Sequence, residues 1–296
     1  MKAHFALIVV NLIYGLNYVV AKDIMPEHIL PNALIWIRVS GATALFWMVY
    51  LFYREKVALK DLLYMAMCAI FGVTLNQLFF FNGLNQTSPI NAAIIMTSNP
   101  ILATIIAAIL LKERLEYFRV IGILLGAFGA IAIVSTGNEV KFGNASIRGD
   151  LFVLINSATY ALYLVLAKPL MSKYKPITVI TMVFSFGLVF ISFWPPVWSE
   201  MNLVQWNTIP SKVYAEIGFV IFGVTFLTYL FNIFALKYVS PTISSTYIYS
   251  QPVFAGFFAW LLISFLGKDY VQDITLTKII CAVVIAFSVW LVGRRK

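Results

Sequence analysis

Ten stretches of apolar residues, each about as long as one membrane span, follow one another along this chain. Turn signals such as Asn-Gln-Thr-Ser-Pro at 85–89 separate them. A hydrocarbon core about 30 Å thick takes up ~20 helical residues. The stretches cover residues 3–22, 32–53, 62–82, 89–111, 117–135, 149–168, 177–194, 214–234, 241–266 and 277–292. The pattern predicts an all-α membrane protein with ten transmembrane helices.

The composition agrees with this prediction. Of 296 residues, 61% are hydrophobic and only 11% are charged, whereas soluble domains carry roughly 25% charged residues. A soluble globular protein is therefore excluded. The two cysteines, Cys68 and Cys281, lie in apolar runs without a CxxC motif or a Cys/His cluster. Neither a disulfide framework nor a metal site is expected.

Lysine and arginine residues are divided unequally between the two sets of helix ends. The ends that include both termini carry 14 of them and the opposite ends carry 7. Positive charge is retained on the cytoplasmic side of a membrane, so both termini are predicted to be cytoplasmic. The same asymmetry explains the net charge of +9 without nucleic-acid binding. We expect a multi-pass protein of the plasma or bacterial inner membrane.

An internal repeat is the strongest organising feature. The segment 14–22 recurs at 160–168, and five residues of the first half recur in the second half at one constant offset: Leu84, Ser88, Pro89, Ser98 and Pro100. The chain is predicted to consist of two five-helix repeats, residues 1–138 and 139–296. Because five is odd, the second repeat crosses the membrane in the opposite sense. Inverted repeats of this kind favour a transporter that alternates access around a midplane site, although channels are also built from repeats.

Several of these residues form recognisable motifs. The first helix and the next one carry Gly15, Asn17-Tyr18, Lys22, Pro31 and Arg38, and the end of the first half carries Asn99-Pro100, Lys112-Glu113-Arg114-Leu115, Gly122, Gly126 and Gly129. In these motifs the chain resembles the drug/metabolite transporter superfamily, specifically its ten-helix EamA-type branch, over nearly its whole length. The second half departs from the pattern, with Gly267-Lys268-Asp269 in place of the acidic turn and Cys281 in place of a glycine. The resemblance implies export or exchange of a small metabolite.

Polar and aromatic residues recur on helix faces in both halves. Asn76, Phe80 and Gly83 share one face, and Thr228, Asn232 and Ala235 repeat it at the same offset. We predict that these faces line a substrate-binding cavity, formed by Tyr14, Asn76, Asn99, Tyr160, Asn232, Tyr247 and Gln251. Arg38 is the deepest charge, and we expect it to contact a carboxylate near the external mouth. The alternatives are helix-helix packing for the amides, and snorkelling or pairing with Asp23 or Glu27 for Arg38.

Two prolines are candidate hinges. Pro100 and Pro252 each follow an amide residue, and a proline cannot bond the carbonyl four residues before it. The carbonyls of Met96 and Ile248 therefore need other partners. A kink that only serves packing is the alternative explanation.

The ionisable residues limit the chemistry of the predicted cavity. No carboxylate lies in the middle of a predicted helix, and no Ser/His or Asp/Asp constellation is present. We therefore expect a carrier and not an enzyme, without cofactors, and with membrane lipids as neighbours. The lining suits a small neutral or zwitterionic molecule such as an amino acid. A multidrug or nucleoside-type carrier, or a non-transporting membrane sensor or assembly protein, remains an alternative, and the pattern does not specify an oligomeric state.

Overall fold

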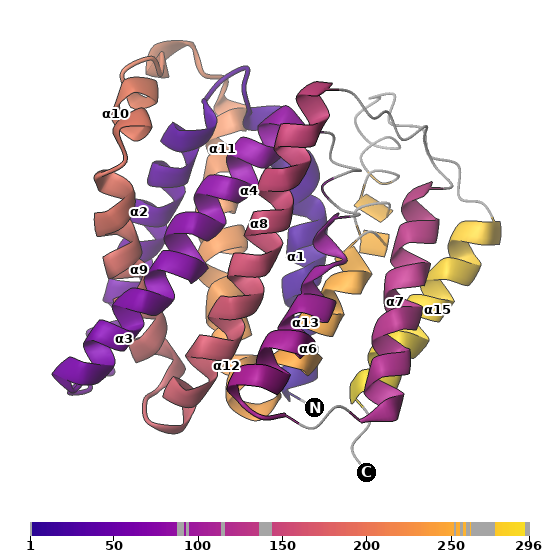
Figure 1. Cartoon of the computed structure of the whole chain (residues 1–296). Coiled ribbons are helices and arrows are strands. Elements are labelled where there is room, and N and C mark those ends of the chain that lie inside the picture. The colour runs from indigo at the N-terminus through magenta and orange to yellow at the C-terminus, as the bar shows by residue number, and fades with distance from the viewer. Residues whose placement is uncertain are drawn as a thin grey trace.

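The computed structural model describes residues 2–87, 92, 95–113, 116–135, 144–251, 253–254, 257–258, 261 and 276–293. Every secondary-structure element within these ranges is helical, and the long helices run side by side as a bundle (Figure 1). The prediction of an all-α protein is therefore confirmed for the described part of the chain.

Helical segments coincide with each of the ten apolar stretches. The first half contains α1 (Lys2–Ile24), α2 (Pro31–Tyr50), α3 (Leu59–Ala69), η1 (Ile70–Thr74), α4 (Leu75–Gln86), α6 (Asn99–Leu110) and α7 (Tyr117–Ser135). The second half contains α8 (Asn144–Ala167), η2 (Lys168–Ser172), α9 (Pro176–Ser192), α10 (Pro195–Met201), η3 (Trp206–Thr208), α11 (Ser211–Phe219), η4 (Val220–Leu227), α12 (Thr228–Tyr238), α13 (Pro241–Thr246), η5 (Tyr247–Ser250) and α15 (Leu276–Gly293).

Several of these helices are suited to crossing a membrane. Among the described residues, four helical segments are long and apolar enough: Pro31–Tyr50, Leu59–Gln86, Ile147–Ser172 and Ser211–Tyr238. A fifth is added if α9 and α10, which meet at a bend of 76°, count as one span. Shorter apolar helices occupy Asn99–Leu110, Tyr117–Gly129 and Val283–Val292.

Local sequence determines where several helices begin. Proline occupies one of the first two positions of α2, α6, α9, α10 and α13, where its missing N–H is not needed and its fixed φ favours the helix. At the start of α2, two backbone N–H groups without an acceptor inside the helix donate hydrogen bonds to a residue far along the chain. The Glu200 carboxylate on α10 accepts hydrogen bonds from the backbone N–H of Asn32 at 2.6 Å and of Ala33 at 3.2 Å. This contact joins α10 to the start of α2.

Two π-helical segments interrupt the long spans of the two halves. The segment η1 lies between α3 and α4, and η4 lies between α11 and α12. With the repeat offset of 152 residues, which relates Leu84 to Leu236, these two segments overlap. Such π segments are rare and occur frequently at functional sites, so their matched placement directs attention to the middle of the bundle.

Helix contacts across the two halves come in matched sets. The segment α4 packs on α8, and its counterpart α12 packs on α1; likewise α2 packs on η4, and α9 packs on η1. The helices α2 and α9 also contact each other, as do α7 and α15. The first turn of α1 and the last turn of α15 lie at the same end of the bundle (Figure 1).

Candidate functional site

A cavity lies in the middle of the bundle among α1, α2, α4, α8, η4, α12 and η5. Its volume is about 60 Å³, which is room for roughly four to six water molecules at ~10–15 Å³ each. A metabolite therefore enters only if side chains move apart. The lining residues are Tyr14, Asn17, Tyr18, Arg38, Asn76, Gln77, Phe80, Met96, Asn156, Tyr160, Val224, Tyr229, Ile248 and Gln251.

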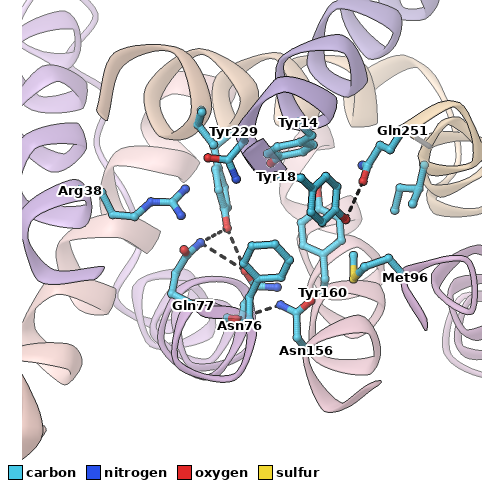
Figure 2. A pocket seen from close by; sticks show the side chains of 14 residues that line it. Tyr14, Tyr18, Arg38, Asn76, Gln77, Met96, Asn156, Tyr160, Tyr229 and Gln251 are labelled. Carbon is cyan, nitrogen blue, oxygen red and sulfur yellow. Dashed lines mark hydrogen bonds between the residues drawn. The ribbon is translucent and has the colours of Figure 1, made fainter. Parts of the chain in front are cut away.

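One wall of the cavity is a network of amides around the Tyr229 hydroxyl. The Gln77 amide donates to Tyr229 Oη at 2.5 Å and lies 3.3 Å from Asn76 Oδ1. The Tyr229 hydroxyl in turn has Asn76 Oδ1 at 3.1 Å and the Gly72 carbonyl at 3.2 Å as acceptors (Figure 2). Gly72 belongs to the π segment η1, so the π segment presents a backbone carbonyl to this network. Gln77 and Tyr229 are counterparts at the repeat offset.

Arg38 is the charged group of the cavity, and its side chain is 3% exposed. Its Nε donates to Thr225 Oγ1 at 2.9 Å, and its guanidinium lies over the Phe81 ring at 4.5 Å from the ring centroid. Among the described residues, no carboxylate lies within ion-pair distance of Arg38. The alternative in which Arg38 pairs with Asp23 does not hold, because Asp23 pairs with Lys212. A buried cation without a counter-ion is costly unless something else stabilises it.

The opposite wall connects the first helix to the second half. The Tyr18 hydroxyl donates to Gln251 Oε1 at 3.2 Å (Figure 2), and Gln251 Nε2 donates to Asn11 Oδ1 at 2.8 Å. The freed carbonyl of Ile248, expected from Pro252, accepts from the backbone N–H of Gln251 because η5 is a 3₁₀ turn. The residue Pro252 itself lies outside the described residues, so its assignment as a hinge stays a prediction.

Three buried amide oxygens on the lining have no hydrogen-bond partner among the described residues: Asn17 Oδ1, Gln77 Oε1 and Asn156 Oδ1. The three side chains are 4%, 3% and 2% exposed. Buried polar groups in proteins are usually paired. Unpaired acceptors on a cavity wall thus indicate a ligand that donates hydrogen bonds.

The structure brings together five of the eight residues that the sequence predicted as substrate contacts. Tyr14, Arg38, Asn76, Tyr160 and Gln251 all line this one cavity. They come from α1, α2, α4, α8 and the residue after η5. Whether each contacts a substrate stays a prediction.

The other three predicted contacts lie outside the lining, for identifiable reasons. Asn99, which precedes Pro100 at the start of α6, donates to the Ser157 carbonyl at 2.7 Å and thereby attaches α6 to α8. The hydroxyl of Tyr247 lies 2.6 Å from His4 Nδ1, near the first turn of α1. Asn232 is buried within α12, and its Nδ2 has no hydrogen-bond partner among the described residues. The bond of Asn99 is the helix-helix packing that the sequence left open as an alternative for the amides.

The sequence did not single out several lining residues as contacts, notably Gln77, Asn156 and Tyr229. One available signal was the repeat offset, which relates Gln77 to Tyr229. For Asn156 no comparable signal exists. Within the described ranges, no group of three or more His, Cys, Asp or Glu residues gathers closely enough to hold a metal ion.

Comparison with known proteins now gives this geometry a context. The model of the EamA-like transporter family matches residues 1–135 and 147–294. The chain belongs to this family. It is therefore a multi-pass membrane protein and a transporter, as its resemblance to EamA-type proteins implied.

Individual relatives carry the same description. An uncharacterized transporter of Archaeoglobus fulgidus is 26% identical over 264 residues, which is 88% of each chain. The uncharacterized transporter YyaM of Bacillus subtilis is 28% identical over 72% of this chain and 71% of its own length. One solved crystal structure at 17% identity matches with a TM-score of 0.71 over 98% of this chain and 96% of its own. At that identity the likeness shows the fold alone.

Proposed function

We propose that this EamA-family transporter is a secondary carrier for a small zwitterionic metabolite of the amino-acid type, working by alternating access as an exporter or exchanger. The observation that carries the proposal is the lining of the central cavity. It combines one unpaired cation, Arg38, with uncharged amides and aromatic rings. A carboxylate would neutralise Arg38, and the rings offer flat apolar walls for the rest of the molecule.

The same lining disfavours other substrate classes. A sugar phosphate requires several clustered cations, and among the described residues that line the cavity Arg38 is the one charged side chain. A multiply cationic drug would meet Arg38 without a compensating carboxylate. A nucleoside-type carrier stays an alternative, because aromatic walls and amides also suit a base. A neutral nucleoside would, however, leave the Arg38 charge without a partner.

The proposal also includes ten spans arranged as two inverted repeats. Its support is the matched set of contacts between the halves. Asn99 on α6 bonds to α8, and its counterpart Gln251 bonds to Asn11 on α1. Each amide thus reaches from the fourth helix of one half to the first helix of the other. Two halves joined by such reciprocal hydrogen bonds can rotate relative to each other around a central site.

Transport assays test the function. Purified protein in proteoliposomes loaded with a neutral amino acid should take up the labelled amino acid by counterflow, and Arg38→Gln should abolish this uptake. Counterflow should persist when the pH gradient is collapsed, because the lining contains no carboxylate that would carry a proton. If nucleosides and not amino acids exchange, the nucleoside alternative replaces the proposal; the absence of any exchange would favour a non-transporting role.

Thiol labelling tests the proposed orientation, with both termini in the cytoplasm of the cell's inner or plasma membrane. Ser172 ends η2, between α8 and α9, and Gln205 follows α10, and both residues are exposed. The connection after α8 and the connection after α10 lie at opposite ends of the bundle (Figure 1). Ser172→Cys and Gln205→Cys therefore provide exposed thiols at the two ends, while the native Cys68 and Cys281 are buried. An impermeant reagent added to intact cells should label Gln205→Cys and leave Ser172→Cys unlabelled. The reverse pattern would overturn the orientation.

A further inference from the structure

The central cavity has polar side chains on both sides and aromatic rings between them. Figure 2 shows Arg38 and Gln77 on one side, and Gln251 and Met96 on the other. Between them lie the rings of Tyr14, Tyr18 and Tyr160. A ligand in this cavity can place charged groups beside Arg38 and Gln77 and its remaining atoms against the tyrosine rings.

The contacts of Arg38 and those of Gln77 lie about one helical turn apart along the cavity. Arg38 lies over Phe81 and bonds to Thr225, whereas Gln77 bonds to Tyr229. Gln77 and Phe81 are four residues apart on α4, and Thr225 and Tyr229 are four residues apart along η4 and α12. Four residues correspond to about one helical turn, or ~6 Å. The two charged groups of an α-amino acid are attached to one carbon atom, so one molecule between Arg38 and Gln77 reaches both residues.

Arg38 and Gln77 offer opposite hydrogen-bonding groups to a ligand. Arg38 offers guanidinium donors without a carboxylate among the described residues. Gln77 offers the buried acceptor Oε1, because its Nε2 is already bonded to Tyr229. Asn156 repeats this arrangement: its Nδ2 donates to the Asn76 carbonyl at 2.8 Å and its Oδ1 is unpaired.

From this arrangement we infer that the site binds an α-amino acid in one orientation, in which Gln77 binds the ligand's ammonium group and Arg38 binds its carboxylate. The side chain then extends between the tyrosine rings toward Met96 and Ile248. The inference rests on the proposed function and adds the amine subsite and the orientation of the ligand.

Three matched probes separate the two charged groups of the ligand. L-phenylalanine carries both, 3-phenylpropanoate lacks the amine, and 2-phenylethylamine lacks the carboxylate. Binding to the purified protein is measured by thermal shift and by equilibrium titration. We expect L-phenylalanine to stabilise the wild type and both analogues to bind roughly 10- to 100-fold more weakly, because each leaves one buried charged-group interaction unmade.

Substitutions of Gln77 test its role directly. Gln77→Met keeps the length of the side chain but has no acceptor, so it should bind L-phenylalanine roughly 10- to 100-fold more weakly while its affinity for 3-phenylpropanoate stays unchanged. Gln77→Glu keeps an acceptor and should retain L-phenylalanine and gain affinity for 2-phenylethylamine. Gln86→Met, the same change on the same helix but outside the cavity, serves as the control and should bind like the wild type.

The outcomes distinguish this inference from the proposed function. If 3-phenylpropanoate binds the wild type as well as L-phenylalanine does, or Gln77→Met binds L-phenylalanine normally while Arg38→Gln does not, the amine subsite is wrong and the carboxylate site stands. If the folded wild type binds none of the three probes at millimolar concentration, both the subsite and the amino-acid substrate class are overturned.

Discussion

Charged side chains are treated differently in the middle of the bundle and at its ends. At one end Lys212 pairs with Asp23 and with Glu216, the latter at 3.1 Å, and at the other end Lys173 lies 2.8 Å from Asp61. In the middle, Arg38 contacts a threonine hydroxyl and an aromatic ring, and no carboxylate of the described residues lies within ion-pair distance of it. Charge pairing at the ends joins helices to one another, whereas the central charge has the free donors that the proposed carboxylate ligand requires.

The largest effect that this contrast predicts is at Arg38. Arg38→Gln should weaken binding of a neutral amino acid by about 1.5–3 kcal/mol, the usual contribution of a hydrogen bond to a charged group. The thermal unfolding temperature should stay the same or rise, because an unpaired buried charge is removed. Titration and thermal unfolding of the purified protein measure the two effects. A variant that binds normally, or that unfolds well below the wild type, would show that Arg38 has a structural role.

Glu200 should show the opposite behaviour. Glu200→Ala removes the acceptor for two backbone N–H groups at the start of α2 and should lower stability by roughly 1–2 kcal/mol, as the loss of a helix cap does. The KM for transport should not change, since Glu200 does not line the cavity. Glu200→Gln, which keeps one acceptor oxygen, should lie between the two in thermal unfolding. An altered KM with unchanged stability would contradict the contrast.

Tyr229 tests whether the central network also contributes to stability. Tyr229→Phe removes a buried hydroxyl that joins Gln77 to the Gly72 carbonyl, and we expect a loss of roughly 0.5–1.5 kcal/mol in the free energy of unfolding. Tyr214→Phe is the matched control: its hydroxyl bonds to the Trp206 carbonyl at 2.9 Å on a side chain that is 45% exposed. Equal losses in the two variants would mean that the network confers no special stability.

The smallest effect is expected at the exposed pair of Lys173 and Asp61. The Asp61 carboxylate raises the pKa of Lys173. The pair therefore stabilises the folded protein at neutral pH, and this small contribution is lost only as the pH rises through the raised pKa. Lys173→Ala should unfold at the same temperature as the wild type from about pH 6 to 9, because exposed pairs contribute little. A clear fall in unfolding temperature in that range would show that this pair matters more than its exposure indicates.

The sequence was most informative about helices and least informative about their faces. Apolar stretches of span length located helical segments, because an apolar run of that length has few other stable structures in a membrane. Some residues of the predicted polar faces line the central cavity and others do not. A single face defined by Asn76 and Phe80 excluded Gln77, which lies about 100° further around the helix. The cavity nevertheless includes it, since α12 presents Tyr229 to that side of α4.

The two amide residues that precede prolines also show that the sequence does not specify which side chains line the cavity. Asn99 and Gln251 are counterparts in the sequence, yet Gln251 lines the cavity and Asn99 does not. The difference arises from their neighbours: Tyr18 reaches Gln251 from α1, whereas Asn99 bonds to the backbone of α8 at Ser157. No periodicity in the chain specifies which neighbour comes closer.

By itself, the sequence determined that this is a helical membrane protein, which residues are polar within its apolar segments and that Arg38 is its deepest charge. These properties follow from local composition and spacing, because the membrane requires each span to satisfy its own backbone hydrogen bonds. Only the tertiary structure decided that, among the described residues, Arg38 has no carboxylate partner and Gln77 Oε1 has no hydrogen-bond donor. Both depend on contacts among helices from the two halves of the chain, since an unsatisfied group is defined by every neighbour within hydrogen-bond distance.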